Sequence, residues 1–133
     1  MNLDKYSIII LQVGSNDLSN IAPSRFRREL MSFARFLQEK HCIQKIVLME
    51  ILHRVHTRKY RMKHTVRQYN QAVDAANGLL TTACRARAYM SFWQHRRLHL
   101  RRLVARDGVH LNEAAMPRYW RSVKGAILGA MRT

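Results

Sequence analysis

The sequence predicts an α/β protein built on a parallel sheet. Two short apolar segments, residues 6–13 and 45–50, are rich in branched side chains at both odd and even positions. That composition is typical of strands covered on both faces. Segments with helical spacing follow both of them, so strand and helix alternate along the chain. Such alternation indicates parallel strands joined by right-handed crossovers, with helices on the faces of the sheet.

Taken in order, residues 6–13 (YSIIILQV) are expected to form the first strand. Residues 24–40 show an apolar stripe with helical spacing, which predicts an amphipathic helix capped by Ser24. The stripe consists of Phe26, Leu30, Phe33 and Leu37. Residues 45–50 (KIVLME) repeat the pattern of a buried strand, and the polar, basic residues 53–63 predict a loop.

The second half continues the alternation. Residues 66–83 predict another helix, and residues 88–92 a short third strand. The helical spacing is carried by Val66, Tyr69, Val73, Ala76 and Leu80. Residues 94–106 have no clean period and are expected to form a long loop. The last helix is expected to begin near Pro117. Its apolar stripe is expected to be Trp120, Val123, Ile127 and Met131.

Length and composition limit the protein class. A chain of 133 residues fits one domain, here residues 1–133, and 24 Lys and Arg against 8 Asp and Glu give a formal net charge of +16. Cys42 and Cys84 are expected to be reduced, buried thiols of an intracellular protein. The longest unbroken apolar run, Ile8 to Leu11, is far too short to cross a bilayer, and Asp4 before it argues against a signal peptide. No membrane association is expected.

The first motif that could support chemistry follows the first strand directly. It reads Gly14-Ser15-Asn16-Asp17. Glycine lets the chain turn sharply at the end of a strand, and the next polar side chain, Asn16, could donate a hydrogen bond into the crevice there. The alternative interpretation is a plain turn, because these four residue types are the commonest in turns.

The second motif reads Asp107-Gly108-Val109-His110, just before the last helix. A carboxylate three residues before a histidine can accept a hydrogen bond from one imidazole nitrogen and leave the other free as a general base. The alternative is a loop aspartate beside a solvated histidine.

Together, Gly-x-Asn-Asp after a strand and Asp-x-x-His before a C-terminal helix resemble the SGNH hydrolases, the superfamily of the GDSL esterases and lipases. The resemblance covers nearly the whole chain but only the C-terminal portion of the family's domain. It implies a three-layer α/β/α fold with a flavodoxin-like parallel sheet of about three strands and three or four helices. It also implies ester hydrolysis through an acyl-enzyme. Gly14 and Asn16 would belong to the oxyanion hole, His110 would be the base, and Asp107 its orienting carboxylate.

The chain departs from the family at one decisive point, since it contains no Gly-Asp-Ser nucleophile motif. Ser15 lies in the segment that matches the oxyanion loop and is interpreted as a turn residue. The domain is therefore expected to be truncated at its N-terminus and inactive by itself, because members of a triad act as a unit. In a flavodoxin-like strand order residues 6–13 would then form an exposed sheet edge. Either a lost upstream segment or the edge strand of another chain would cover it; truncation is the preferred explanation.

The second hypothesis is a basic module that binds nucleic acid, of the kind that an esterase-like fold could supply in a mobile element. Residues 53–106 contain 13 Lys and Arg and one acid, Asp74. Within them Trp93 precedes paired arginines, which suit stacking and phosphate contacts. These candidate contacts are Arg96, Arg97, Arg101 and Arg102. The alternative is a solvated basic surface. No metal or cofactor is expected, since His53 and His56 form only a single His-x-x-His pair.

Overall fold

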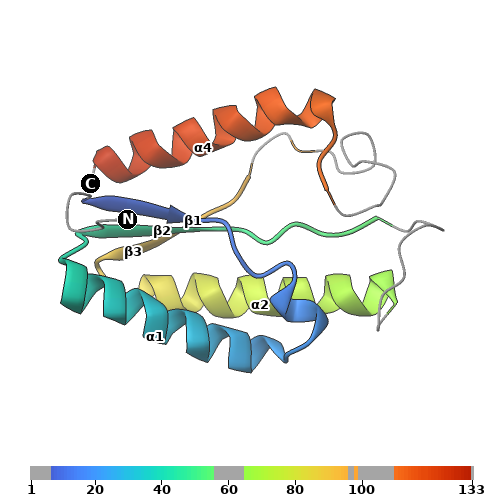
Figure 1. Cartoon of the computed structure of the whole chain (residues 1–133), viewed down its shortest axis with the longest axis horizontal. Coiled ribbons are helices and arrows are strands. Elements are labelled where there is room, and N and C mark those ends of the chain that lie inside the picture. The colour runs from blue at the N-terminus through green and yellow to red at the C-terminus, as the bar shows by residue number, and fades with distance from the viewer. Residues whose placement is uncertain (1–6, 56–64, 96–97, 99–109, 133) are drawn as a thin grey trace.

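A computed structural model describes residues 7–55, 65–95, 98 and 110–132 of the chain (Figure 1). Its elements are β1 (Ile8–Leu11), α1 (Pro23–His41), β2 (Lys45–Met49), α2 (Val66–Arg85), β3 (Met90–Trp93) and α4 (Met116–Met131). Two short 3-10 helices, η2 (Asp17–Ser19) and η3 (Glu113–Ala115), follow β1 and precede α4. The order of strands and helices agrees with the expected alternation.

The three strands form one sheet in the order β1-β2-β3, and both pairings are parallel. In register, Ile8 lies opposite Lys45 and Ile46 lies opposite Met90. Helices α1 and α2 cover one face of the sheet, and α4 covers the other (Figure 1). The predicted α/β class, with a parallel sheet between helical layers, is therefore confirmed.

Position in the sheet explains how far each strand is buried. The central strand β2 has four buried residues, Ile46 to Met49, whereas all four residues of β1 are only half-buried. Apolar residues at both odd and even positions suit β2, which has a neighbour on each side and helices on each face. β1 has the same composition but lies at an edge of the sheet, as the strand order predicts.

The helix ends follow local chemistry, with one correction. Ser24 does not cap α1: the N-cap is Ala22, which makes no side-chain hydrogen bond, and Pro23 begins the helix with its φ already suited to that position. The N-terminus of α2 has a complete capping box. The main-chain N–H of Gln68 donates to Thr65 Oγ1 at 3.1 Å, and the N–H of Thr65 donates to Gln68 Oε1 at 3.0 Å.

Two apolar cores lie on the two faces of the sheet. The larger one, between the sheet and the pair α1 and α2, contains the buried face of α1, which is Phe26, Leu30, Met31, Ala34 and Leu37. Phe33 was expected in this stripe, but 45% of its surface is exposed, so its assignment was wrong. Ala34 is instead fully buried, and the main packing partner of α1 is helix α2.

The stripe predicted for α4 was correct only for Val123, which is half-buried and packs against the core on this face of the sheet. The side chains of α4 that are buried are small, namely Ser122, Ala126 and Ala130. Trp120, Ile127 and Met131 are instead 59%, 39% and 66% exposed. Small residues on the inner face bring the helix axis close to the strands, and this packing excludes the larger side chains from the interface.

Candidate active site

The loop after β1 turns at Gly14, whose φ of 109° is a conformation that residues with a Cβ rarely adopt. A Cβ built on Gly14 would lie 2.6 Å from Phe26 Cζ and 2.9 Å from Ile51 Cδ1. The turn therefore requires glycine for two reasons, backbone conformation and lack of space. The N–H of Leu18 donates to the carbonyl of Gly14 at 3.0 Å and closes the turn.

Asn16 follows at the start of η2, but its side chain does not cap that helix. Asn16 is exposed, and within the described part of the chain its side-chain amide has no hydrogen-bond partner. An unengaged amide next to a cavity can donate to a ligand oxygen. This geometry suits the oxyanion role that the sequence predicted for Asn16, which stays a prediction.

The peptide between Ser15 and Asn16 is held from behind by two side chains. Arg54 Nη2 donates to the carbonyl of Ser15 at 3.0 Å, and the Tyr69 hydroxyl donates to the same carbonyl at 3.0 Å. The guanidinium of Arg54 also lies over the Tyr69 ring, 4.0 Å from its centroid. In a trans peptide the next N–H points opposite to the carbonyl. The main-chain N–H of Asn16 is therefore directed away from Arg54 and Tyr69.

Arg54 is the least expected residue of this region. It came from a basic segment that the sequence predicts to be a loop, yet it is 3% exposed. Its Nη1 donates to Ser19 Oγ at 3.0 Å, so one guanidinium joins both ends of the Ser15–Ser19 segment. A buried arginine bound to a loop in this way restrains that loop.

A cavity of about 580 Å³ lies at the carboxyl ends of β1 and β2, where ligands bind in open α/β sheets. Gly14, Asn16 and His110 all line it. The other described residues that line it are Gln12, Val13, Ser15, Asp17, Ile51, Leu52, Leu111, Met116 and Tyr119. None of these is Lys or Arg, although the chain has a formal net charge of +16.

Some predicted site residues lie outside the described part of the chain. Asp107 is one of them, so its predicted pairing with His110 stays a prediction. The four candidate nucleic-acid contacts, Arg96, Arg97, Arg101 and Arg102, also lie outside it. The described serines near the first motif are bound to other groups. Ser15 Oγ lies 3.1 Å from the Tyr69 hydroxyl, which agrees with its interpretation as a turn residue.

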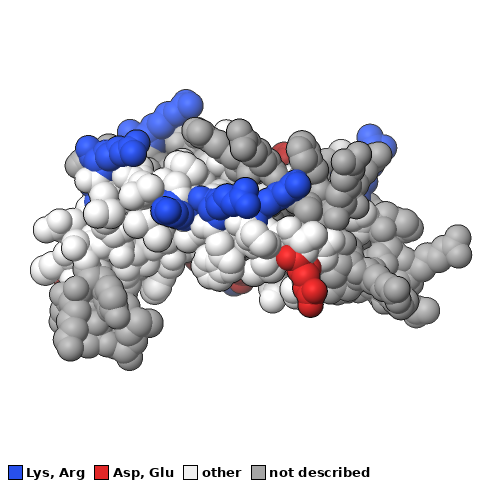
Figure 2. Space-filling view, turned by 90° about the horizontal axis from the view of Figure 1, so that it is seen from above, with Lys and Arg blue, Asp and Glu red and all other residues white. Residues whose placement is uncertain are grey.

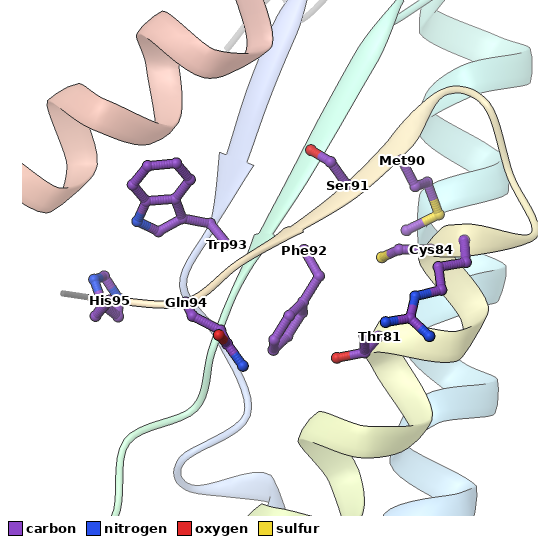
Figure 3. Close-up of a pocket in the computed structure, with 9 residues that line it drawn as sticks. Thr81, Cys84, Met90, Ser91, Phe92, Trp93, Gln94 and His95 are labelled. Atoms are coloured by element: carbon purple, nitrogen blue, oxygen red, sulfur yellow. The ribbon is translucent and has the colours of Figure 1, made fainter.

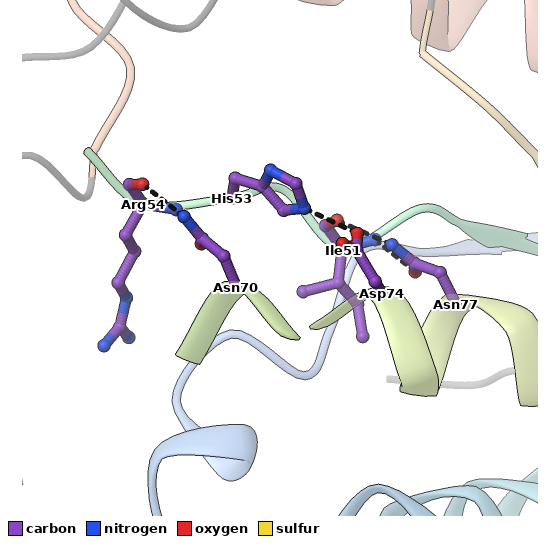
Figure 4. A network of polar contacts seen from close by, with 6 residues as sticks. All are labelled: Ile51, His53, Arg54, Asn70, Asp74 and Asn77. Atoms are coloured by element: carbon purple, nitrogen blue, oxygen red, sulfur yellow. Dashed lines mark hydrogen bonds and ion pairs between the residues drawn. The ribbon is translucent and has the colours of Figure 1, made fainter. Parts of the chain in front are cut away.

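The segment after β2 is attached to α2 by two asparagine side chains (Figure 4). Asn77 accepts from the N–H of Ile51 at 2.9 Å and donates to its carbonyl at 2.9 Å. Asn70 does the same for Arg54, at 2.8 and 2.9 Å. Seven helical residues rise about 10.5 Å and three extended residues span about 10 Å, so the two spacings match. The position of Arg54 follows from this attachment.

One further pair lies between these asparagines. His53 Nε2 is 2.6 Å from Asp74 Oδ1, and both side chains are substantially exposed (Figure 4). The pair lines a second cavity of about 650 Å³ with Thr65, Val66, Arg67, Asn70 and Gln71. Because the pair is exposed and spans the same two elements as the asparagines, it is best explained as a restraint on the segment after β2.

A polar network forms one wall of the candidate site. His95 Nε2 lies 2.7 Å from Gln12 Oε1, and its Nδ1 lies 2.8 Å from Ser122 Oγ. Gln12 Nε2 donates to the carbonyl of Glu50 at 3.0 Å, which identifies Gln12 Oε1 as an acceptor. His95 must then carry its proton on Nε2. The Tyr119 hydroxyl donates to the same Gln12 oxygen at 3.2 Å.

Burial controls the protonation of this network. Desolvation lowers the pKa of His95 to about 4, so the ring is neutral near pH 7. Burial raises the pKa of the Tyr119 hydroxyl and of the Glu50 carboxyl. For Glu50, the hydrogen bond from the main-chain N–H of His95 partly offsets this effect by lowering the pKa. A neutral His95 lets Ser122 donate to Nδ1 while Ser122 Oγ accepts from Trp93 Nε1 at 2.9 Å. All of these polar groups are thereby satisfied.

A third cavity, of about 590 Å³, lies beside β3 (Figure 3). It is lined by Met90 to His95 of β3 and the residues after it, and by Thr81, Cys84 and Arg85 of α2. Burial raises the pKa of Cys84 to about 11, so its thiol stays protonated and is a poor nucleophile. Cys84 is buried as expected, whereas Cys42 is exposed, and that part of the cysteine prediction was wrong.

Within the described residues, no group of three or more His, Cys, Asp or Glu side chains could hold a metal ion. In the same part of the chain, no helix is both long and apolar enough to cross a membrane. The sequence matches no protein-family model, and no curated protein matches it.

Proposed function

We propose that the cavity at the carboxyl ends of β1 and β2 is the oxyanion and base portion of a serine ester hydrolase site of SGNH type. The observation that supports this proposal is that Gly14, Asn16 and His110 line one cavity although Asn16 and His110 are 94 positions apart in the sequence (110 − 16). The nucleophilic serine would come from another polypeptide segment. The chain by itself would then be inactive, since a base and an oxyanion donor without a nucleophile give little acyl transfer.

In the proposed reaction a serine hydroxyl attacks the ester carbonyl while His110 takes its proton. The amide of Asn16 and its main-chain N–H donate to the oxyanion that forms on the carbonyl oxygen. The tetrahedral intermediate expels the alcohol, which receives the proton from His110, and leaves an acyl-enzyme. Water then attacks the acyl-enzyme while His110 takes its proton; the serine oxygen leaves, recovers that proton from His110, and the acid is released. Asp107 would orient His110 in both steps.

The lining of the cavity favours an uncharged acyl group. Val13, Ile51, Leu111 and Met116 supply apolar contacts, and Lys and Arg are absent from the described lining. Among the described lining residues Asp17 carries a negative charge, so it would disfavour an additional negative charge on the acyl chain, away from the oxyanion donors of Asn16. Short-chain esters of neutral alcohols are therefore the proposed substrates.

Binding can be tested on the chain as it exists with butyrate, whose carboxylate oxygens imitate the oxyanion. Titration followed by ¹H–¹⁵N NMR is expected to shift the main-chain amide of Asn16, its side-chain amide and the His110 ring signals. Asn16→Asp keeps the shape of the side chain but replaces the donor by a negative charge, so butyrate is expected to lose its effect. The assignment of the oxyanion site would be contradicted if butyrate caused no shifts in the wild type, or if it caused the same shifts in Asn16→Asp as in the wild type.

Hydrolysis is tested with p-nitrophenyl butyrate, using the chain alone and a version extended upstream by a strand that ends in Gly-Asp-Ser. We expect turnover only by the extended version, and its loss in His110→Ala. If the chain alone hydrolysed the ester and its His110→Ala variant did not, the prediction that the chain alone is inactive would be refuted. An extended, folded version without turnover, or with turnover that is insensitive to His110→Ala, would refute the proposed reaction.

Nucleic-acid binding remains a second candidate because of one observation on α4. Arg118, Arg121 and Lys124 are exposed, and Met116–Met131 contains no acidic residue. Figure 2 looks onto this side of the molecule and shows basic side chains spread across it. Phosphate contacts release counterions, so affinity for a fluorescent oligo-dT strand should fall steeply as salt rises. Absent or salt-insensitive binding would exclude this candidate, as would an unchanged affinity in Arg118→Gln with Arg121→Gln.

A further inference from the structure

The hydrogen bonds around His95 run in one direction, and the groups at both ends fix that direction. At one end the indole N–H of Trp93, which can only donate, bonds to Ser122 Oγ at 2.9 Å. At the other end Gln12 Nε2 donates to the main-chain carbonyl of Glu50, which leaves Gln12 Oε1 as an acceptor. Between them His95 accepts on Nδ1 and donates from Nε2. The two ends therefore agree on one arrangement of protons.

This arrangement occupies Gln12 Oε1 completely. An amide oxygen has two lone pairs, and here one accepts from His95 Nε2 at 2.7 Å and the other from the Tyr119 hydroxyl at 3.2 Å. Because Gln12 Oε1 has no proton to donate, the Tyr119 hydroxyl uses its single proton in that bond. The Tyr119 oxygen keeps its lone pairs, and within the described residues no group donates to it.

Tyr119 is held at the wall of the candidate site. Its ring centroid lies 5.2 Å from that of His95 and 5.5 Å from that of Trp120. Tyr119 and Gln12 both line the cavity at the carboxyl ends of β1 and β2, and Asn16 lines the same cavity. Burial raises the pKa of the Tyr119 hydroxyl, so the hydroxyl stays protonated near pH 7. The cavity wall therefore presents a hydroxyl whose proton is already engaged and whose oxygen can still accept.

A hydrogen-bond donor on a substrate gains more at this position than an acceptor does. A hydroxyl or an amide N–H can donate to the Tyr119 oxygen and leave every existing hydrogen bond intact. A carbonyl or ether oxygen could receive the Tyr119 proton only if the bond to Gln12 were broken, and no hydrogen bond would then be gained. A polar site of this kind discriminates against analogues that lack the matching donor.

We propose that Tyr119 is a specificity-determining residue, which selects esters that carry a neutral hydrogen-bond donor, a hydroxyl or an amide N–H, against the Tyr119 oxygen. This inference rests on the proposed function, because it takes Asn16 as the group that binds the reacting carbonyl. A neutral donor also agrees with the uncharged acyl group that the lining of the cavity favours.

Pairs of ligands that differ only in the donor test the proposal. On the acyl side, γ-hydroxybutyrate is compared with γ-fluorobutyrate, in which an atom of similar size without a proton replaces the hydroxyl. On the alcohol side, hydroxyethyl butyrate is compared with fluoroethyl butyrate. Dissociation constants are measured by ¹H–¹⁵N NMR titration of the chain. In at least one pair the hydroxyl ligand should bind about threefold to tenfold more tightly, which is the usual net effect of one hydrogen bond.

Two tyrosine variants assign this difference to one oxygen. Tyr119→Phe removes only the hydroxyl, so the two ligands of the pair should bind this variant equally well. Tyr89→Phe is the matched control. Tyr89 is half-buried like Tyr119, but it lies just before β3 and is not among the residues that line the cavity. The affinity difference should therefore be unchanged in Tyr89→Phe.

The proton positions are tested separately by a long-range ¹H–¹⁵N spectrum of the His95 ring, in which Nε2 should carry the proton and Nδ1 none. A proton on Nδ1 would reverse the direction of the hydrogen bonds and overturn the proposal. So would equal affinities within both ligand pairs in the wild type, a difference that persists in Tyr119→Phe, or one that Tyr89→Phe also abolishes.

The same titrations separate this inference from the proposed function. If the ligands shift the Asn16 signals but both pairs bind equally, the role of Tyr119 is wrong and the oxyanion assignment stands. If no ligand shifts the Asn16 signals, the proposed function and the role of Tyr119 are both wrong.

Discussion

Replacement of Gly14 by alanine is expected to destabilise the protein strongly. A residue with a Cβ at φ 109° carries about 1–3 kcal/mol of backbone strain. The new methyl would also lie 2.6 Å from Phe26 and 2.9 Å from Ile51. Both side chains are buried, at 5% and 2% exposure, and cannot swing into solvent. Such overpacking costs about 1–3 kcal/mol. The free energy of unfolding should therefore fall by about 2–6 kcal/mol in total, measured by urea denaturation with circular dichroism.

Gly78→Ala is the matched control for this measurement. Gly78 lies in α2, and a Cβ built on it would have no atom within 4 Å. Alanine there should raise the free energy of unfolding by about 0.5–1 kcal/mol, because glycine loses more conformational freedom in a helix. A Gly14→Ala protein as stable as the wild type would refute the turn geometry, and with it the position of Asn16. Equal destabilisation by both variants would refute the steric argument.

Three further predictions concern stability measured by urea denaturation. His95 takes up its proton near pH 4 in the folded state but near pH 6.5 when unfolded. The contribution of His95 to the free energy of unfolding is therefore present above about pH 6.5 and is lost as the pH falls toward 4. We expect this loss to be about 1–2 kcal/mol after solvent screening, and to be absent in His95→Asn. Asn77→Ala should cost about 2–3 kcal/mol, because both main-chain groups of Ile51 lose their partners. Gly125→Ala should cost about 1–3 kcal/mol by forcing the Trp93 ring to move.

Each of these predictions has a control or a contradicting outcome. The slope of stability against pH between 4 and 6.5 should differ between the wild type and His95→Asn, and identical slopes would contradict the buried neutral ring. Gln71→Ala, at an exposed position of α2, should change stability by no more than about 0.5 kcal/mol. Gly129→Ala should be neutral or stabilising, since its nearest neighbour lies at 3.7 Å. A Gly129→Ala variant as unstable as Gly125→Ala would contradict the packing of α4 on Trp93.

Much of the candidate site could be anticipated from short motifs. Gly14 and Asn16 follow a clear strand and His110 precedes a clear helix, so the rule that ligands bind at the carboxyl ends of parallel strands brings these residues to one region. The residues that hold the loop could not be found in this way. Arg54 looks like one cation among many in a basic segment. Its burial results from Asn70 and Asn77, whose seven-residue spacing on α2 was the only available signal.

The network around His95 shows the same limit. Its members Gln12, Glu50, His95, Tyr119 and Ser122 come from three strand ends and one helix, and no local pattern links them. Hydrogen bonds between such distant positions depend on the strand register and on how closely α4 approaches the sheet. Both are properties of packing, which a periodicity argument does not contain.

The order of the elements and the parallel α/β class follow from the amino-acid sequence, because strand and helix periodicities are local and are clear in β2 and α2. Which face of α4 is buried depends instead on how that helix packs against the sheet. Trp120, Ile127 and Met131 have the spacing of a core stripe, and Ser122, Ala126 and Ala130 lie on the neighbouring face. A helix can lie close to the sheet only if the side chains between them are small, so α4 packs on the sheet through its serine and alanine face. The large apolar residues are thereby left exposed beside β1, where sequence alone had placed only an open strand edge.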